Sequence, residues 1–299
     1  MKAGTIELSR AVARIARMKR IGRPRIRRWS TDRLVRLALA HGAAPGGWAA
    51  IAQLHSRGSP ALLAHVQALA RSPRARRRAL GLDIAAQLRA PGPSRDYPGE
   101  PYAVEATQAL LVAGLADAHA SVVQSAIAGL GHRPAAGALP ALLGFLAHPD
   151  ARIRFALAYT LGSYPDADAT AALVRLATDA DDDVRDWATF SLGTISEADN
   201  DDVRRVLWTN AHDANRDVRG EAAVGLARRS DPRVVELLKA RLLADDWQLY
   251  ELEAVEEMPS PELLETLHRL RDTTQHSPDL DPRWYRHLLE AIDACELVA

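Results

Sequence analysis

The sequence has a single cysteine and no long apolar run, and each absence excludes a class of protein. One cysteine, Cys295, among 299 residues excludes an intramolecular disulfide and a cysteine-rich zinc site. It is typical of a reducing compartment, so we expect a cytoplasmic protein. The apolar runs end after about eight residues, whereas a membrane-spanning helix needs about 20. We therefore expect no transmembrane segment.

Aromatic residues are also scarce, at 5% of the chain, although hydrophobic residues together reach 47%. Alanine and leucine supply most of this apolar content, and the β-branched and aromatic residues that favour strands are few. The composition therefore predicts a folded, all-α protein with a sizeable core.

An internal repeat organises the middle of the chain. Four segments share an acidic or substitute residue, then Val/Ile-Arg, then an alanine-rich stretch that ends in Leu-Gly or a close variant. They cover residues 118–131, 149–162, 180–193 and 214–227, and their aliphatic and leucine columns repeat at 31, 31 and 34 residues. The columns are Val122, Ile153, Val184 and Val218, and Leu130, Leu161, Leu192 and Leu226. A period of this length indicates a stack of supersecondary units.

Each unit reads as two helices. Ile153, Leu157 and Leu161 lie four residues apart on one helical face, and a second amphipathic stretch precedes each such helix. The turns between the two helices carry proline and aspartate, which suit a helix N-terminus.

The period, the Asp…Val-Arg…Ala…Leu-Gly pattern and turns such as Gly137-Ala-Leu-Pro140 resemble HEAT repeats, in particular the bacterial phycobilisome-lyase-like sub-type. The resemblance implies a right-handed α-α superhelix, or solenoid, of about eight helix pairs. We expect clear repeats over 102–258, further pairs at 30–90 and capping helices at 259–299. Residues 91–101, rich in proline and glycine, are expected to form a loop or hinge, and residues 1–29 a basic arm or helix.

The resemblance also implies a ladder between units, made by an acidic turn residue and the arginine of the second helix. The positions that match are Asp150 with Arg154, Asp181 with Arg185, and Asn215 with Arg219. The first clear unit departs from the pattern, with His119 and Val123 at these positions.

The 38 basic and 38 acidic residues balance, but they are segregated along the chain. Residues 1–100 hold 20 Lys/Arg and 5 Asp/Glu, a net charge of +15, and residues 101–299 hold 18 and 33, a net charge of −15. The basic third predicts an anion-binding surface for nucleic acid, acidic lipid or acidic protein. The candidate residues are Arg25, Arg27, Arg28, Arg74, Arg76, Arg77 and Arg78.

Alternatives stay open for residues 1–29. The arm could be disordered, could dock on the acidic part of the same chain, or could arise from a start codon placed upstream of Met18. The stretch 6–21 is also basic and amphipathic, as a membrane-surface helix or transit peptide would be.

Signatures of catalysis are missing, so we expect no enzymatic activity, no cofactor and no metal. None of the ten histidines is followed by glutamate, as deoxyhypusine-hydroxylase-like proteins would require. A HEAT-like DNA glycosylase using Trp29, Trp48 and Asp32 remains the enzymatic alternative. The acidic turns 179–183 and 199–202 are interpreted as helix caps rather than Ca²⁺ loops, and Cys295 as a buried apolar residue.

A binding role remains. The residues after the ladder arginines are expected to line the concave face, and the candidates there are Phe155, Asp186, Trp187 and Glu221. An aromatic ring among carboxylates suits a basic or amphipathic partner segment. The sequence therefore predicts a scaffold or adaptor that binds a protein partner, with a nucleic-acid binder as the alternative.

Overall fold

The computed structural model describes residues 26–42, 44–92, 99–244, 248–276 and 280–299. Sixteen α-helices account for most of these residues, and the only β-pairing among them is an isolated bridge between Arg89 and Pro101. The predicted all-α class is therefore confirmed. None of the helices in this part of the chain combines the length and the apolar character that crossing a bilayer requires.

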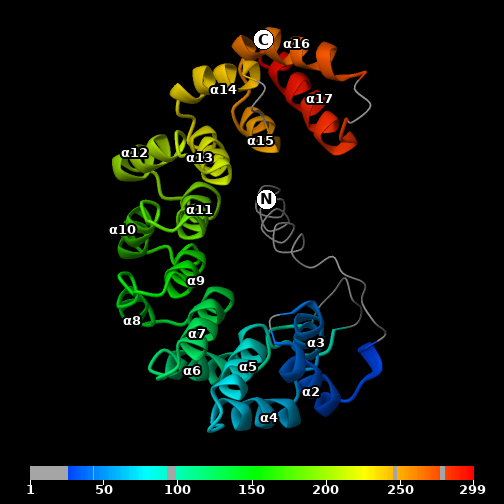
Figure 1. Ribbon diagram of the computed structural model, residues 1–299, viewed down its shortest axis with the longest axis vertical. Coiled ribbons are helices and arrows are strands. Elements are labelled where there is room, and N and C mark those ends of the chain that lie inside the picture. The colour runs from blue at the N-terminus through cyan, green and yellow to red at the C-terminus, as the bar shows by residue number, and fades with distance from the viewer. Residues whose placement is uncertain (1–25, 43, 93–98, 245–247, 277–279) are drawn as a thin grey trace. The chain divides into compact units, whose positions relative to one another are not determined.

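The chain forms two compact units, and the boundary lies between Tyr164 and Pro165. The first unit contains a short 3₁₀ turn and eight α-helices (Figure 1). These are η1 (Ile26–Arg28), α2 (Thr31–His41), α3 (Pro45–His55), α4 (Pro60–Ala70), α5 (Ala75–Ala86), α6 (Val104–Gly114), α7 (Ala120–His132), α8 (Leu139–Leu143) and α9 (Ala151–Leu161). Of the segment 91–101, predicted as a loop or hinge, residues 93–98 lie outside the described residues, and the isolated bridge joins Arg89 before it to Pro101 at its end.

The second unit contains eight further α-helices, a π-helical end to α11 and a 3₁₀ turn. These are α10 (Ala167–Leu176), α11 (Asp182–Phe190), η2 (Ser191–Ile195), α12 (Asp201–Asn210), α13 (Arg216–Arg228), α14 (Arg233–Leu243), α15 (Leu249–Glu257), η3 (Pro261–Leu263), α16 (Leu264–Thr274) and α17 (Pro282–Glu296).

Consecutive helices pair, and the pairs stack. In the second unit α11, α13, α15 and α17 pack successively against one another, and α10 packs on α12 while α14 packs on α16 (Figure 1). We call the row formed by the second helix of each pair the second-helix layer. The same stacking of second helices joins α5, α7 and α9 in the first unit. The eight helix pairs of the predicted α-α solenoid are thus confirmed.

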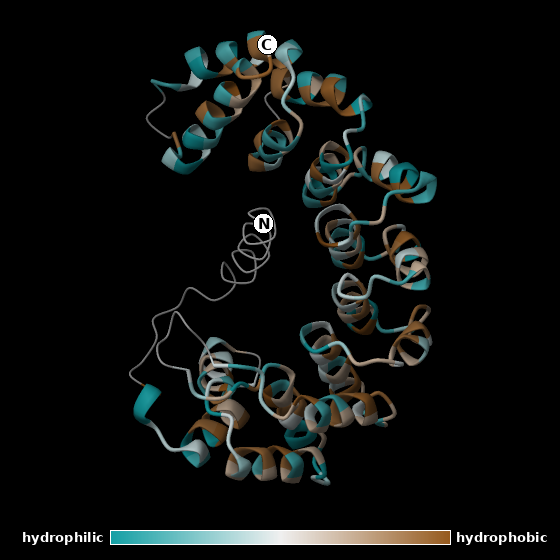
Figure 2. Cartoon of the chain, turned by 180° about the vertical axis from the view of Figure 1, so that it is seen from behind, coloured by the Kyte–Doolittle hydropathy of each residue, from teal (hydrophilic) through white to brown (hydrophobic). Residues whose placement is uncertain are grey.

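The two repeat columns form the core between the layers. All eight residues of the aliphatic and leucine columns are buried, with exposures of 1% or less. The helices of both units carry hydrophobic and hydrophilic stretches side by side (Figure 2), as amphipathic helices in two layers require. The periodicity seen in the sequence is therefore the periodicity of the core.

The unit boundary also separates the charges. Residues 1–164 contain 23 Lys/Arg and 8 Asp/Glu, a net charge of +15, whereas residues 165–299 contain 15 and 30, a net charge of −15. Residues 101–164 are neutral, with three of each. The two units therefore carry net charges of opposite sign.

Candidate interaction surfaces

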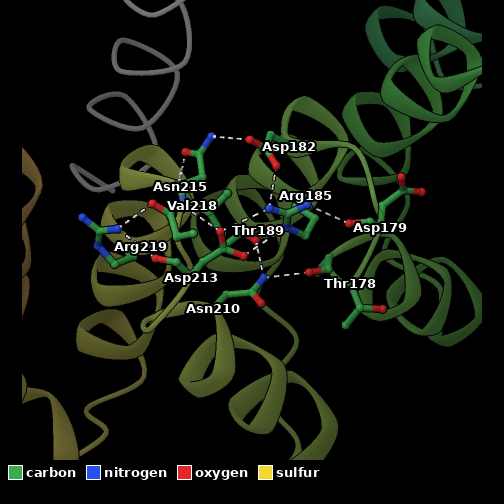
Figure 3. Close-up of polar contacts among 12 residues, drawn as sticks. Thr178, Asp179, Asp182, Arg185, Thr189, Asn210, Asp213, Asn215, Val218 and Arg219 are labelled. Atoms are coloured by element: carbon green, nitrogen blue, oxygen red, sulfur yellow. Dashed lines mark hydrogen bonds and ion pairs between the residues drawn. The ribbon is translucent and has the colours of Figure 1, made fainter.

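Arg185 of α11 joins two consecutive repeats (Figure 3). Its Nη1 donates to the carbonyl oxygens of Asp179, at 2.9 Å, and Ala180, at 3.3 Å, in the turn before its own helix. Its Nε and Nη2 donate to the two carboxylate oxygens of Asp213, at 3.0 and 3.2 Å, in the turn before α13. A bidentate pair between arginine and a carboxylate adds geometric specificity as well as energy. Arg185 therefore fixes the distance between the two turns.

Arg78 of α5 makes the same set of contacts in the first unit. It donates to the carbonyls of Ser72 and Pro73 in its own turn, and to both carboxylate oxygens of Asp117 at 2.6 and 2.8 Å. The hydrogen bond from Arg78 lowers the pKa of Asp117. Arg78 was a candidate for anion binding, but its guanidinium is occupied within the ladder.

The other two ladder arginines keep the contacts to their own turns. Arg154 donates to the carbonyls of His148 and Pro149, at 2.8 and 3.3 Å. Arg219 donates to the carbonyls of Asp213 and Ala214, both at 2.8 Å. The arginine column predicted by the repeat is therefore a structural one.

The acidic partners differ from the predicted ones. Asp150, Asp181 and Asn215 are N-cap residues whose side chains accept hydrogen bonds from backbone amides of their own helices. The side chain of Asp150 also accepts from Arg152, which lowers its pKa to about 2. Asp181 accepts hydrogen bonds from the amides of Asp183 and Val184, whereas the carboxylates that Arg185 contacts are those of Asp182 and Asp213 rather than the predicted Asp181.

The acids that complete the ladder lie two residues before each cap. Asp117 precedes His119 and Asp213 precedes Asn215 by this spacing. Burial acts to raise the pKa of Asp213, but the hydrogen bonds from Arg185 and from the Asn215 amide outweigh it and leave the pKa lowered. An Asp-x-cap column was visible in the repeat and would have identified these residues.

Two buried arginines follow second helices and were not predicted. Arg229, at the end of α13, donates to five backbone carbonyls, including those of Leu192, Gly193 and Ser196 at the end of the preceding second helix. Arg133, at the end of α7, likewise donates to the carbonyl of Leu88, 2.6 Å away, just after α5. The last carbonyls of a helix lack intrahelical partners. Each of these arginines supplies hydrogen bonds to such carbonyls at the end of the second helix in the preceding repeat.

The four partner-binding candidates do not form one exposed cluster. Asp186 and Glu221 are buried, at 7% and 5% exposure. Trp187 is partly exposed and packs edge to face on Phe190, with 5.5 Å between ring centroids. Phe155 is partly exposed and belongs to the first unit. Of the three candidates in the second unit, Trp187 is the one that is not buried.

Trp187 lies beside exposed acids that the sequence reading did not select. Asp183 is exposed and lies four residues before Trp187 on α11, so both occupy one helical face. Asp217 occupies the equivalent position on the adjacent α13, is also exposed, and accepts a hydrogen bond from the hydroxyl of Tyr250, 3.3 Å away. We call Asp183, Trp187, Asp217 and Tyr250 the acidic-aromatic surface.

A glycine makes room for this surface. The ring of Tyr250 lies so close to Gly220 that a Cβ there would stand 2.2 Å from a ring carbon. Gly220 occupies the repeat position of Phe155 and Asp186, so its lack of a side chain is what admits the tyrosine. The contact ties α15 to α13 in the second-helix layer.

The remaining anion-binding candidates are exposed where they are described. Arg27 and Arg28 lie in η1, and Arg74, Arg76 and Arg77 lie at the start of α5. Arg25 lies outside the described residues. Neighbouring exposed arginines at 33, 36 and 71 extend this set.

The three residues considered for a glycosylase site, Trp29, Trp48 and Asp32, do not lie on one element. Trp29 lies beneath Arg33, whose guanidinium carbon is 3.6 Å from the centre of a tryptophan ring. Trp48 is 39% exposed on α3, and Asp32 is exposed in the first turn of α2. This cation–π contact orients an arginine at the surface.

One cluster of possible metal ligands occurs among the described residues. Ligand atoms of Glu256, His287 and Glu290 all lie within 4.8 Å of one another. His287 Nδ1 is 2.7 Å from Glu256 Oε1 and 3.6 Å from Glu290 Oε2. These contacts join α15 to α17. Cys295 is buried, and burial raises the pKa of its thiol.

Comparison with known proteins gives the same fold. Residues 108–193 match the family described as HEAT repeats. The solved structure of YibA from Escherichia coli superposes with a TM-score of 0.63 at 23% identity, covering 90% of this chain and 93% of YibA. An engineered protein superposes with a TM-score of 0.49 at 18% identity, covering 88% and 77% of the respective chains. Among curated protein sequences, none matches this chain. Residues 108–193 thus resemble HEAT repeats, and the chain has the fold of a HEAT-like solenoid.

Proposed function

We propose that the protein is a non-catalytic scaffold or adaptor that binds a protein partner on the second-helix layer of its acidic unit. The observation that carries this proposal is the acidic-aromatic surface, where the partly exposed Trp187 is flanked by exposed carboxylates on two stacked helices. An aromatic anchor with a rim of one charge is typical of protein interfaces.

The partner chemistry follows from the charge. The second unit has a net charge of −15, so it attracts basic segments over several ångströms and repels anions. An arginine or lysine side chain can stack on Trp187 while its charge is neutralised by Asp183 or Asp217. The partner is therefore a protein with a basic or amphipathic segment.

The repeat pattern supports a finer assignment within the same proposal. The alanine-rich Asp…Val-Arg…Leu-Gly units favour the bacterial phycobilisome-lyase-like sub-type of HEAT repeats. The single cysteine favours a cytoplasmic location. Lyase activity does not follow from the repeat, because one solenoid fold serves many unrelated roles.

Cross-linking in the native host, followed by binding assays with each purified candidate partner, tests this function. Trp187→Ala together with Asp183→Asn is expected to weaken binding of a basic partner at least 10-fold, since a buried aromatic anchor contributes about 2 kcal/mol or more. The control is Asp201→Asn with Asp202→Asn. It removes two exposed acids from α12, which is the first helix of its pair and therefore lies outside the second-helix layer. Equal affinity for all three proteins would contradict the proposal.

A second candidate function is favoured by the opposite unit. The exposed arginines of η1, α2 and α5 form a surface of positive charge, and such a surface attracts anionic macromolecules. This function is independent of the acidic-aromatic surface, because the two surfaces lie in different units.

A further inference from the structure

The first two helix pairs are almost without negative charge. Residues 26–92 contain eleven arginines, no lysine and two acids, Asp32 and Asp83. Burial raises the pKa of Asp83 to about 6, so both acids are largely ionised at pH 7 and together offset only two of the eleven arginine charges. Eight of the eleven arginines are exposed. They are Arg27, Arg28, Arg33, Arg36, Arg71, Arg74, Arg76 and Arg77.

Five of these side chains belong to one surface, which we call the arginine surface. Arg27 and Arg28 lie in η1, and Arg33 and Arg36 lie one turn apart on the exposed side of α2. Arg76 reaches across from α5, and its Nη2 lies 3.4 Å from the carbonyl oxygen of Ala40 near the end of α2. From Arg33 to Ala40 the helix rises about 10 Å, so the charges follow α2 along most of its length.

The arginine surface is held on a rigid base. Arg57 donates from Nη1 to the carbonyl of Trp29 and from Nη2 to the carbonyl of Arg27, both at 2.6 Å, which fixes η1 against the first helix pair. The indole of Trp29 supports the guanidinium of Arg33 from below. An arginine positioned in this way loses less conformational entropy when it binds a ligand.

The start of α5 adds to the same field. Arg76 and Arg77 occupy the first turn of this helix, which contains no acidic residue, although the positive end of the helix dipole favours acids there. The equivalent turn of α11 carries Asp182 and Asp183.

The chemistry of the surface distinguishes among anionic partners. Leu34, Val35 and Ala38 of α2 are buried in the core, and Leu37 and Leu39 are partly buried and pack against it, so α2 has no fully exposed large apolar side chain to insert into a lipid surface. Arginine binds phosphate oxygens through two parallel hydrogen bonds. An exposed aromatic, Trp48, lies on the adjoining α3, and aromatic side chains can stack on bases.

We propose that the arginine surface binds a nucleic acid through its phosphate backbone, without reading the base sequence. Arg33, Arg36 and Arg76 contact phosphates, while Trp29 and Arg57 position them. This inference rests on the second candidate function and names its ligand and its residues.

The test measures binding of the full chain to a labelled 20-base-pair DNA duplex between 50 and 300 mM KCl. Arg33→Gln, Arg36→Gln and Arg76→Gln are combined in one variant. The matched control combines Arg205→Gln, Arg283→Gln and Arg286→Gln, which removes three exposed arginines from the second unit. Each lost phosphate contact lowers the slope of log K against log salt by about 0.9. We expect the slope of the first variant to fall by about 2 to 3, and its affinity at 0.1 M salt to fall at least about 30-fold, while the control stays within about threefold of the parent.

Two results would overturn this inference. In the first, the parent binds the duplex, but the two variants either lose affinity equally or both keep it. The phosphates then contact other residues, and the second candidate function still stands. If the parent binds vesicles with 30% anionic phospholipid or poly-glutamate but not the duplex, the ligand is not a nucleic acid. Absence of binding to all three probes would reject the second candidate function itself.

Discussion

Arginine residues have different roles in this protein, depending on whether the guanidinium is buried or exposed. Arg229 is 9% exposed, and its guanidinium donates to the backbone carbonyls of Ala198, Gly193 and Leu192. Desolvation lowers its pKa, yet an arginine stays charged because its unperturbed pKa is above 12. Arg33, by contrast, is exposed and stacks on an indole. The same residue type therefore serves as a structural cap in one place and as a surface charge in another.

Asp83 gives a prediction at the residue scale. Burial raises its pKa to about 6, and a hydrogen bond from Ser125 only partly offsets the shift. The folded protein therefore takes up a proton near pH 6, whereas the unfolded chain does so near pH 4, and the contribution of Asp83 to stability falls as pH rises from 4 to 6. We expect Asp83→Asn, which resembles the protonated acid, to raise the free energy of unfolding at pH 7 by about 1–2 kcal/mol, and to leave it unchanged near pH 4.

Urea denaturation at the two pH values measures this difference. Asp32→Asn, at an exposed position on α2, is the control and is expected to change stability little at either pH. A gain for Asp83→Asn that is the same at pH 4 and pH 7 would show that protonation of Asp83 is not the cause.

At the scale of elements, some helices begin with a capping side chain and others, α5 among them, do not. Side chains of Ser30, Ser59, Asn200 and Asp281 cap the helices that follow them. The N-cap of α5 is Arg74, whose side chain makes no capping hydrogen bond. The helix forms nonetheless, because Leu80, Leu82 and Ile84 are buried in the repeat core. Tertiary packing outweighs a poor helix start.

The cost of this helix start can be measured. Arg77→Glu places an acid in the first turn of α5 and is expected to raise the free energy of unfolding by about 0.3–1 kcal/mol at low salt. The same change at Arg175, in the last turn of α10, is expected to lower it by a similar amount, because the dipole there favours a base. Thermal unfolding at 20 mM and 500 mM salt provides the comparison. If both variants shift in one direction, the helix dipole is not responsible.

At the scale of the whole molecule, the repeats contact mainly their neighbours, and this limits how far a local change spreads. In the second unit each second helix packs on the next, and Arg229 and Arg185 each join one repeat to the adjacent one. The stability of a solenoid comes largely from such interactions between adjacent repeats. A lost contact is therefore expected to weaken one region and leave distant pairs intact.

Hydrogen exchange of Arg229→Met tests this locality. The substitution leaves buried carbonyls at the end of α11 without a donor, and it is expected to lower the free energy of unfolding of the second unit by about 3 kcal/mol. Amides of α11 and α13 should exchange faster, while those of α2 to α5 keep their protection. Arg228→Met, which removes a partly exposed arginine 3.6 Å from Glu257, is the control. An equal loss of protection along the whole chain would contradict a nearest-neighbour description.

The sequence by itself determined the fold class, the number of helix pairs and the core. Its 31- to 34-residue period put Val184, Leu192 and their equivalents in register, and helical spacing alone is enough to bring such residues into one core. It also determined that positive and negative charges belong to different parts of the chain.

Only the tertiary structure decided which polar side chains meet. The acid that pairs with Arg185 is Asp213, 28 residues away, whereas the neighbouring Asp181 is drawn to its own helix by two backbone amides. It also decided that Asp186 and Glu221 are buried while Asp183 and Asp217 are exposed. A helical period fixes the face on which a residue lies, but contacts between repeats depend on turn geometry and on side-chain direction, which the period does not contain.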